Sequence, residues 1–562
     1  MGRPKSLRAI DLYSGVGGWS LGLQLAGIKV VASYERSEAA NQTNMRNNRH
    51  GVHTLDIRKL KLSELPKDID VVVGSPPCTQ FSYANRGGNG DIADGLVDLI
   101  KFLKIVDFIK PKHWAMENVP RVANIIEKEI QAGGKLRAFA HLLKSVRIVN
   151  MEDFGLPQRR RRCIAGNFDF QLLDTYKSVL GPKTLGDVVS ALNSAQVTDP
   201  LYGIKIRKSD VTDHVVENFL NEEEARINKA NKYNHPVYNR MPFPDSLTRS
   251  SRTITATSTR VSRESVIIRD LETPSRFRRL TIRESACLQG FPINYQFFGK
   301  NYNRRMEMVG NAVPPLFSYL VAHAFRCTPS TFVKQLKDVG ALFKAPADKP
   351  ERLNAPKCGT KFHPNRTFRF AIPNLRMKSG VRFELANSFK GNEASWMVKF
   401  YFGSSKSIQT IHLDQTLYLK LVGTLPPAVV NLIGQELALV SSTCLAADVG
   451  QMQKVWAHRG SGDTHPFDLL DQLSVSGETI ETALRLHRTE SEECIEIALK
   501  HQFDKNSSKI TGIEKLRRLA PATLAGLLIG SLANAALTSH GRAADAPHRG
   551  TEAEHPSVEY VN

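Results

Sequence analysis

The sequence contains few cysteines and no spacing that would use them together. Its 562 residues include only seven cysteines, an odd number, and no C-x-x-C pair occurs. We therefore expect no disulfide framework and no zinc knuckle, but reduced thiols in a protein of the cytoplasm. Neither Cys358 with His363 nor His458 with His465 is dense enough to indicate another metal site, so no metal is expected.

Long apolar runs are also absent. The longest, residues 524–537, is too short to span a bilayer comfortably and includes Ser531 and Asn534. Gly526 and Gly530 form a G-x-x-x-G pattern there, but a buried or partner-facing helix is favoured over a membrane helix. A strand pattern begins at about Leu7, which leaves no room for a cleaved signal, so we expect no membrane association.

Acidic residues are outnumbered by basic ones. Lys and Arg total 76 against 55 Asp and Glu, which gives a formal net charge of +21. This excess favours a polyanionic partner, with a membrane surface or simple solubility as alternatives. Hydrophobic residues make up 41% of the chain, which is typical of a globular protein, and its length predicts about three or four domains.

The first 120 residues alternate between strand and helix patterns. This alternation predicts an α/β fold with a doubly wound, mostly parallel sheet. Strands are expected at residues 9–13, 29–34, 52–55, 71–73 and 113–116; helices are expected at residues 94–109 and around Leu21, Leu23 and Leu25.

Polar residues follow the ends of the first three strands. Ser14 to Gly18 form a glycine-rich turn whose backbone amides can approach a phosphate or carboxylate. The second strand ends at Glu35, where such folds hold a ribose, although a carboxylate at a helix N-terminus is an equal alternative. Asp56 follows the third strand and is suited to accept a hydrogen bond from an adenine amino group.

Cys78 follows the fourth strand on a loop that contains Pro76 and Pro77. A lone cysteine is most often a small buried hydrophobic residue. Two prolines stiffen the backbone and remove donors just before the sulfur, which favours a thiol held in place to face a ligand. The fifth strand delivers Glu117 to the same edge of the sheet, so both side chains are expected in one crevice; a glycine-rich mobile loop is predicted at residues 85–90.

Four consecutive arginines, residues 159–162, indicate by themselves a solvated face or a phosphate clamp. Taken with the other motifs, however, the chain resembles the DNA (cytosine-5) methyltransferase family over about residues 7–326. The resemblance is carried in order by Asp11-Leu-Tyr-Ser-Gly-Val-Gly-Gly18, Glu35, Asp56, Pro76-Pro-Cys78, Glu117-Asn-Val119, Gln158-x-Arg160-x-Arg162, Arg279-Leu-Thr-Ile-Arg-Glu284 with Leu288-Gln-Gly-Phe-Pro292, and Gly310-Asn-Ala-Val-Pro314. One departure occurs: the family usually has Gln directly after the cysteine, whereas Thr79 intervenes here before Gln80.

The resemblance implies a Rossmann-like enzyme that flips a cytosine out of duplex DNA and methylates its C5 from S-adenosylmethionine. Cys78 matches the nucleophile that adds to C6, Glu117 the residue that hydrogen-bonds the base, and Arg160 and Arg162 the nearby cations, so these four are the expected catalytic residues. The implied cofactor contacts are Tyr13, Ser14, Gly15, Gly17, Gly18, Glu35, Asp56, Pro76, Leu96, Asn311 and Val313; the expected DNA contacts are Gln80, Ser82, Gln158, Arg249, Arg252 and Arg260.

Domain boundaries follow from the same resemblance. The catalytic domain is expected at residues 1–169 and 276–330, closed by a helix at residues 315–326, with a small mixed target-recognition domain at residues 170–275. Hydroxyls and arginines interleave at residues 246–260, and such side chains bond phosphates and read guanine edges; an exposed edge strand is the alternative. Asp213 to Lys232 is predicted to be a solvated helix.

Residues 331–562 lie outside the resemblance. We predict a linker at residues 344–356, an α+β C-terminal domain of unassigned role within residues 331–540, and a disordered tail at residues 541–562. Strands are expected at residues 367–370, 381–385, 396–402 and 416–422, with helices after Gly477.

The sequence therefore predicts a DNA cytosine-5 methyltransferase acting on double-stranded DNA. By resemblance, it would be the modification enzyme of a restriction-modification or related defence system, with cognate restriction or defence proteins as partners. The alternatives are the tRNA-methylating branch of the same family and a nucleic-acid-binding protein that has lost catalysis. Against the latter, every position needed for the chemistry is filled.

Overall fold

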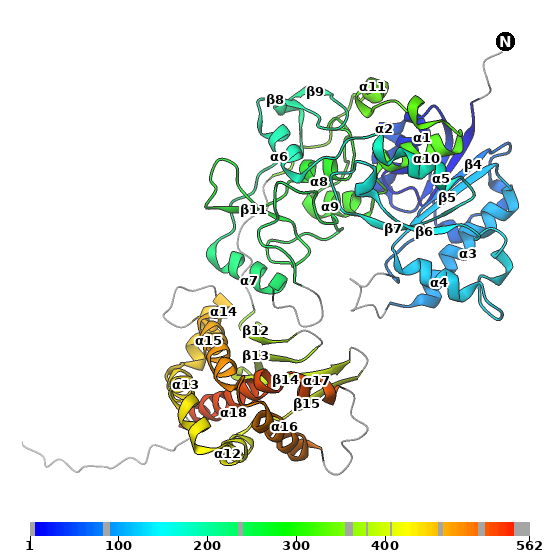
Figure 1. Ribbon diagram of the computed structural model, residues 1–562. Coiled ribbons are helices and arrows are strands. Elements are labelled where there is room, and N and C mark those ends of the chain that lie inside the picture. Colours follow the sequence, from blue (N-terminus) through cyan, green and yellow to red (C-terminus); the bar gives the residue numbers. More distant parts are fainter. Residues whose placement is uncertain are drawn as a thin grey trace, which may run out of the picture. The chain divides into compact units, whose positions relative to one another are not determined.

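The computed structural model describes residues 6–81, 90–233, 240–354, 363–377, 380–404, 407–458, 465–503 and 512–543. The chain divides into two compact units, Met1–Asn228 with Pro242–Cys358, and Lys229–Met241 with Gly359–Asn562. Each unit has its own sheets (Figure 1). The predicted glycine-rich loop, apart from Gly90, and the predicted tail after Ala543 lie outside the described residues.

A seven-stranded sheet with the order β3-β2-β1-β4-β5-β7-β6 organises the first unit. Strands β1 to β5 run parallel, and β7 runs antiparallel to both of its neighbours. The strands are β1 (Arg8–Leu12), β2 (Lys29–Glu35), β3 (Gly51–Thr54), β4 (Val71–Gly74), β5 (His113–Asn118), β6 (Val146–Asn150) and β7 (Arg161–Gly166). The predicted α/β class with a doubly wound sheet is confirmed, and the chain changes direction across the sheet at β1 and β4, where such folds bind ligands.

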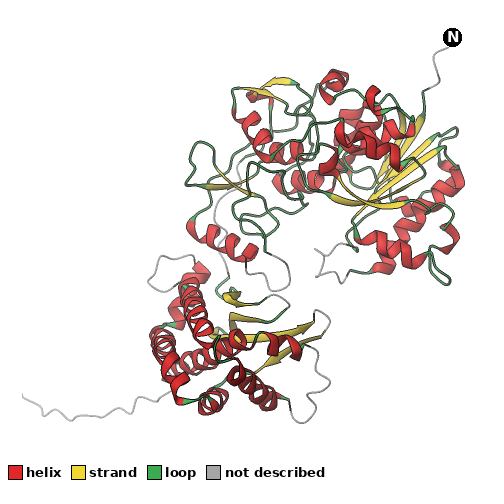
Figure 2. Ribbon diagram, in the orientation of Figure 1, coloured by secondary structure: helices red, strands yellow, loops and turns green. Residues whose placement is uncertain are grey.

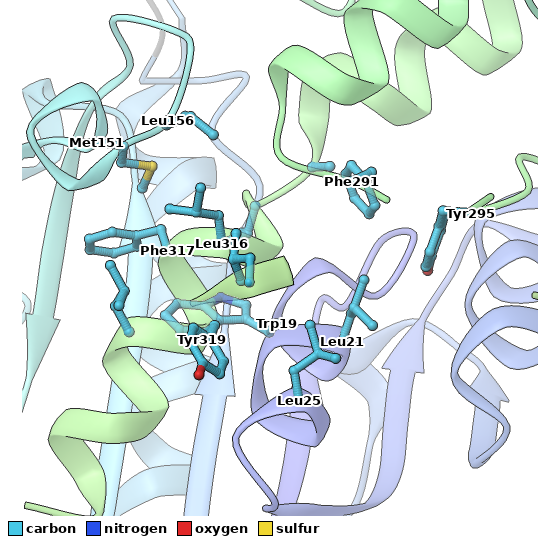
Figure 3. Close-up of a cluster of buried hydrophobic side chains, with 14 of the residues drawn as sticks. Trp19, Leu21, Leu25, Met151, Leu156, Phe291, Tyr295, Leu316, Phe317 and Tyr319 are labelled. Atoms are coloured by element: carbon cyan, nitrogen blue, oxygen red, sulfur yellow. The ribbon is translucent and has the colours of Figure 1, made fainter. Parts of the chain in front are cut away.

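Alternate residues of the central strands serve two cores, one on each face of the sheet. Val71 and Val73 belong to the core that contains Trp19 and Leu316, whereas Val72 belongs to the core that contains Phe102. Figure 3 shows part of the first core, where side chains of α1 (Gly18–Leu25) and α10 (Pro315–Phe325) meet. The predicted closing helix therefore packs against the first elements of the chain. The other flanking helices are α2 (Glu38–Asn48), α3 (Ile92–Ile109) and α4 (Arg121–Glu129).

Shorter elements fill the segment between β7 and α10. They are α5 (Phe170–Thr175), α6 (Leu185–Asn193), β8 (Gln196–Thr198), β9 (Lys205–Arg207), α7 (Glu222–Tyr233), β10 (Ile267–Arg269), β11 (Phe277–Arg279), α8 (Ile282–Leu288) and α9 (Tyr302–Asn311); α11 (Leu336–Val339) follows α10. Residues 246–260 form no strand, because their β pairing among the described residues is limited to the isolated bridge between Ser251 and Gln158. Only the second half of the helix expected at Asp213 to Lys232 exists, as α7, and residues 213–221 are not helical. Glu224 and Asn228 are buried, so one face of α7 is not solvated.

The predicted linker at residues 344–356 is packed as far as it is described. Arg49 donates to the carbonyls of Lys344 and Ala345, and the buried Arg305 donates to the carbonyl of Glu351 at 2.7 Å. Leu353 is buried, and its amide donates to Thr212. Residues 344–354 therefore belong to the first unit and are not a free linker.

The second unit combines an antiparallel sheet, in the order β12-β13-β14-β15, with seven described helices (Figure 2). Its strands are β12 (Arg369–Arg376), β13 (Arg382–Lys390), β14 (Glu393–Ser404) and β15 (Ser407–Ile411); its helices are α12 (Gln415–Thr424), α13 (Pro427–Ala446), α14 (Val449–His458), α15 (Pro466–Leu484), α16 (Arg488–Gln502), α17 (Ile513–Arg518) and α18 (Ala520–Ala543). The first three predicted strands overlap β12, β13 and β14.

The predicted strand at residues 416–422 is wrong, because this segment is helix α12. The Asp414 side chain accepts a hydrogen bond from the Leu417 amide at 2.7 Å and so caps the helix N-terminus. Leu417 and Leu421 lie four residues apart and are both fully buried, as a helical face requires. Helices therefore begin well before Gly477.

The apolar run of the C-terminal region is a core helix. By length and composition, α13 and residues 520–538 of α18 could each cross a membrane, but 78% of the latter window is buried inside the protein. A Cβ atom on Gly526 would lie 2.1 Å from the Phe383 ring, and one on Gly530 would lie 2.5 Å from Leu413. The two glycines thus let α18 approach its own sheet closely, in agreement with the predicted buried helix.

This packing predicts opposite effects of two glycine substitutions in long helices. Gly526→Ala is expected to lower the free energy of unfolding by about 2 kcal/mol, because the added methyl overlaps Phe383. Gly434→Ala in α13 meets nothing within 4 Å and is expected to raise it by up to about 1 kcal/mol, through helix propensity alone. Urea unfolding of the full chain measures both; equal effects would contradict the close approach of α18.

Candidate active site

The loop after β4 is fixed by hydrogen bonds from three directions. The Ser75 amide donates to the Leu12 carbonyl at 3.1 Å, and Trp19 Nε1 donates to Ser75 Oγ at 3.1 Å. Asn118, at the end of β5, donates from Nδ2 to the Pro76 carbonyl at 3.0 Å. Cys78 therefore follows a stretch of chain that both neighbouring strands hold, and it is half-buried.

Glu117 and two arginines lie beside this loop. Glu117 is 6% exposed, and Arg162 Nε lies 2.8 Å from its Oε1. Arg160 is 2% exposed, with Nη2 at 4.0 Å from the same oxygen and at 2.9 Å from the Ala312 carbonyl that it donates to. The Nε and Nη1 atoms of Arg160 are buried and have no hydrogen-bond partner among the described residues. Since unmet buried donors are costly, Arg160 is poised to donate to an additional group.

The charges around Cys78 keep its thiol protonated in the absence of other molecules. Burial raises the pKa of the Cys78 thiol, and the negative charge of Glu117 raises it further, while Arg162 and Arg160 oppose this only in part. Burial, followed by repulsion from Arg162, lowers the pKa of Arg160 to about 9, so this guanidinium is still a cation at neutral pH. A nucleophilic role for Cys78 therefore requires a proton acceptor, and Glu117 is the carboxylate whose charge acts on it.

The glycine-rich turn lies between β1 and α1. Tyr13, Gly15 and Gly17 have φ angles of 54°, 52° and 83°, a region that favours glycine. The Gly15 amide donates to Glu35 Oε2 at 3.2 Å, which ties the turn to the end of β2. A Cβ atom on Gly15 would meet nothing within 4 Å, whereas one on Gly18 would lie 1.9 Å from the Val313 carbonyl. The turn is thus open on its Gly15 side and closely packed on its Gly18 side.

Further predicted cofactor residues line the neighbouring strand ends. Asp56 is exposed and caps a short helical turn by accepting from the Arg58 amide at 3.0 Å, while Leu96 on α3 is buried. Pro76 and Val313 are also buried, Asn311 is exposed at the end of α9, and Ser14 lies buried in the turn. An open glycine turn, a carboxylate at the end of β2 and an apolar wall fit a nucleoside ligand with a carboxylate tail.

Sequence reasoning missed the polar groups that support this region. Asp98, 5% exposed, accepts from the Tyr13 hydroxyl at 3.2 Å and from Arg58 at 2.7 Å. Buried Asp11 accepts from Ser20 Oγ at 2.7 Å, and burial raises the pKa of Asp11 to about 7. Asp11 belongs to the motif Asp11 to Gly18, but nothing in the sequence indicates that Asp98 of α3 lies beside Tyr13.

The predicted DNA contacts occupy different environments. Arg249 is exposed; Ser82 lies outside the described residues; Gln80 accepts from the Asp91 amide at 3.0 Å and thereby joins the start of α3. Gln158 is fully buried, donating to the Leu288 carbonyl and accepting from the Ile254 amide at 2.8 Å. Its position therefore corrects the expectation that Gln158 contacts DNA.

Two of the predicted base-reading arginines hold the protein together instead. Arg252 Nε lies 2.6 Å from Oδ1 of buried Asp245, and Arg260 Nη2 lies 2.7 Å from Oε2 of buried Glu224. Arg260 also donates to the carbonyl of Phe219. A buried carboxylate requires a cationic partner, so the guanidinium groups of Arg252 and Arg260 are already engaged within the protein. Of the three arginines predicted to read bases, Arg249 is the exposed one.

Comparison with known proteins identifies the family to which this site belongs. Residues 7–327 match the family described as C-5 cytosine-specific DNA methylase. The chain belongs to this family. It is therefore a DNA (cytosine-5)-methyltransferase, and members of the family use S-adenosylmethionine as methyl donor. Residues after 327 lie outside the match.

Curated relatives of the methylase are type II enzymes. It is 26% identical to the type II methyltransferase M.FnuDI of Fusobacterium nucleatum over 360 residues, 59% of this chain and 98% of the relative. It is 29% identical to M1.HphI of Haemophilus parahaemolyticus over 57% of this chain and 86% of that relative. A solved structure titled as a putative DNA modification methyltransferase encoded within an E. coli prophage covers 57% of this chain and 99% of that chain, at 20% identity and a TM-score of 0.43.

The charges around Cys78 predict the pH at which its thiol becomes reactive. Iodoacetamide, which reacts with thiolates, should alkylate Cys78 at a higher pH midpoint than that of an ordinary thiol. Glu117→Gln removes a charge that raises the pKa of Cys78, so the midpoint is expected to fall. Peptide mass spectrometry over a pH series measures this, with the exposed Cys327 in the same chain as reference. An unchanged or higher midpoint in Glu117→Gln would show that the carboxylate does not act on the thiol.

Substitutions of the arginines in residues 246–260 are expected to change the free energy of unfolding by different amounts. Arg252→Ala leaves the Asp245 carboxylate buried without its cation, which should lower the free energy of unfolding by about 3 kcal/mol. Arg249→Ala removes an exposed side chain and should change it by less than about 0.5 kcal/mol. Chemical unfolding compares the two; a fully stable Arg252→Ala protein with altered DNA sequence preference would restore Arg252 as a base reader.

Proposed function

We propose that this methylase modifies C5 of a cytosine flipped out of a specific duplex DNA sequence, as the modification enzyme of a restriction-modification or related defence system. The observation that carries the proposal is the meeting of Cys78, Glu117 and Arg162 at the ends of β4, β5 and β7, beside the open glycine turn. Flipping is required because stacking covers both faces of a base within a duplex. The defence context rests on the type II relatives.

In the proposed first step, Cys78 Sγ bonds to C6 of the cytosine. The thiol proton moves to Glu117, the carboxylate whose charge disfavours the thiolate, and from there to N3 of the base as the C5–C6 double bond gives up its electron pair. Arg162 holds the Glu117 carboxylate in position. The unused donors of Arg160 face a group that accumulates negative charge, such as the base carbonyl oxygen.

In the second step, the electron-rich C5 accepts a methyl group. S-adenosylmethionine, when bound, supplies that group from its sulfonium centre. Loss of the C5 proton to a base then restores the C5–C6 double bond and expels Cys78 as thiolate. Return of the N3 proton through Glu117 to the sulfur regenerates the thiol and releases neutral 5-methylcytosine. Tyr13, Ser14, Gly15, Gly17 and Gly18 would hold the cofactor's amino-acid end, with Glu35 at the ribose and Asp56 and Leu96 at the adenine.

Sequence recognition is assigned to residues 170–275. Arg249 is exposed in this region, and its backbone carbonyl accepts from the Leu185 amide at 2.8 Å, so its attachment is rigid although its side chain is available. A bidentate arginine contact to guanine contributes about 1–3 kcal/mol of discrimination. Arg249 is therefore the arginine proposed to read a base, because Arg252 and Arg260 are engaged in ion pairs.

Substitution at the two proposed catalytic side chains tests this function. Cys78→Ala is expected to abolish methyl transfer and leave S-adenosylmethionine affinity within a few fold, because the sulfur contacts the base. Glu117→Gln is expected to lower kcat by about 10²–10⁴-fold with DNA affinity nearly unchanged, as for loss of a proton donor in the transition state. Tritiated methyl transfer and cofactor titration measure both.

Cys327→Ala serves as the matched control, since Cys327 is exposed after α10 and makes no contact with the proposed site. It should retain full activity. Methylation that persists in Cys78→Ala would end the covalent mechanism, whereas loss of activity in all three variants would show that the assay reports folding.

A further inference from the structure

The two faces of the sheet in the second unit are unequal. Phe383 of β13 meets Gly526 of α18, Leu375 of β12 meets Gly477 of α15, and Phe402 of β14 meets Phe503 after α16. These side chains all project from one face, because residues on facing strands alternate in register. Helices α15 and α18 contact the sheet on this face.

The opposite face, called here the open face, carries the other half of β13 and β14. Arg382 pairs in register with Tyr401 and Glu384 with Lys399, while Arg369 of β12 lies on the same face through its pairing with Ala386. Farther along the strands, Ser388 lies opposite Ser395. Arg382 and Glu384 are buried in this face, and Arg376 beside them donates to the carbonyl of Tyr233 at the end of α7. The accessible part of the open face consists of Arg369, Lys399, Tyr401 and Ser395.

Charge within the second unit is divided in the same way. Residues 363–411, which hold the sheet, contain eight Lys and Arg but only two Asp and Glu. Residues 412–543, which hold the helices, contain twelve Lys and Arg and fourteen Asp and Glu. The positive charge of this unit is therefore concentrated in the segment that forms the open face, as expected for a surface that meets a polyanion.

The cations of the open face are held in place but only partly neutralised. Buried Glu384 binds both Arg369, at 2.6 Å, and Arg382, at 2.7 Å, so one carboxylate orients two guanidinium groups. Both guanidinium groups lie over the Tyr401 ring, at 5.2 and 4.7 Å from its centroid. The Arg369 side chain is still 54% exposed, and Lys399 has no ion-pair partner among the described residues.

We infer that the open face is a docking surface for the sugar–phosphate backbone of double-stranded DNA. Pre-oriented arginines and a lysine, with serine hydroxyls nearby, are the groups that proteins use to contact phosphates. The partner is the DNA on which the first unit acts, but the contact is sequence-independent and does not depend on the catalytic steps proposed above. The second unit, which lies outside the methylase match, would thus increase the affinity of the chain for DNA.

The test uses the full chain and DNA binding alone, so that failure of the catalytic proposal cannot affect it. Arg369→Gln with Lys399→Gln removes two cations from the open face. Arg485→Gln with Lys500→Gln is the matched control, because both are exposed on the helical side and the loss of charge is equal. Fluorescence anisotropy with a duplex of arbitrary sequence measures affinity over a series of KCl concentrations, and circular dichroism checks folding.

Each phosphate contact contributes about 0.9 to the slope of log affinity against log salt, so the open-face pair should reduce that slope by about 1.8. Lys399→Gln alone, which breaks no ion pair, should reduce it by about half as much, and the control pair should leave it unchanged. Equal changes in the open-face and control pairs, or no change in either, would overturn the inference. Weakened binding of single-stranded DNA with unchanged duplex binding would also overturn it, since stacking on Tyr401 would then be the binding mode.

Discussion

The first unit depends on one close approach, that of Gly18 to the carbonyl of Val313. A Cβ atom on Gly18 would lie 1.9 Å from that oxygen, so only glycine at position 18 allows the segment around Val313 to pack this closely against the start of α1. Tyr295 and Asn48 hold the same turn by donating to the carbonyls of Val16 and Gly17. The glycine-rich turn is therefore shaped by residues from both ends of the matched sequence, which places the two ends in one compact unit.

Buried arginines of the first unit make contacts of two different kinds. Arg283 pairs with Asp213 where both side chains are completely buried, and Arg278 pairs with Glu284 in similar isolation. In each pair the guanidinium charge is balanced by a buried carboxylate, so the pair holds its two segments together and is not available to bind a ligand. Arg160 differs because its firmest contact is a backbone carbonyl and its remaining donors are unmet. An arginine whose charge is paired thus differs visibly in its hydrogen bonds from one with unmet donors, although both kinds occur in motifs of similar composition.

The sequence could predict the sheet and the meeting of Cys78 with Glu117, because both depend on local pattern. Runs such as Val71–Val73 bounded by glycine or proline specify buried parallel strands, and the carboxyl ends of parallel strands meet at one edge. The role of Arg260 could not be predicted, since the carboxylate that binds it comes from a separate segment, helix α7. The partner of Arg252, Asp245, is only seven residues away, but a spacing of seven in an irregular segment does not predict that the two side chains meet. Helix α12 was mistaken for a strand because its alternating apolar residues also suit a strand, and the decisive feature, capping by Asp414, lies outside that run.

The DNA contact inferred for the second unit would offset an energetic cost of base flipping. Extruding a base costs a few kcal/mol of stacking and pairing, and the contacts that read the target sequence must offset this before any net affinity remains. Backbone contacts from the open face, as inferred above, would add affinity equally to every sequence. They would offset the cost without altering the preference that the proposed recognition region, residues 170–275, would set. Because the second unit is covalently attached, each contact made by one unit raises the effective concentration of DNA at the other. Such a sequence-independent contact requires cations that are gathered on one surface. The cations Arg369, Arg382 and Lys399 lie on one face of the C-terminal sheet, as this contact requires.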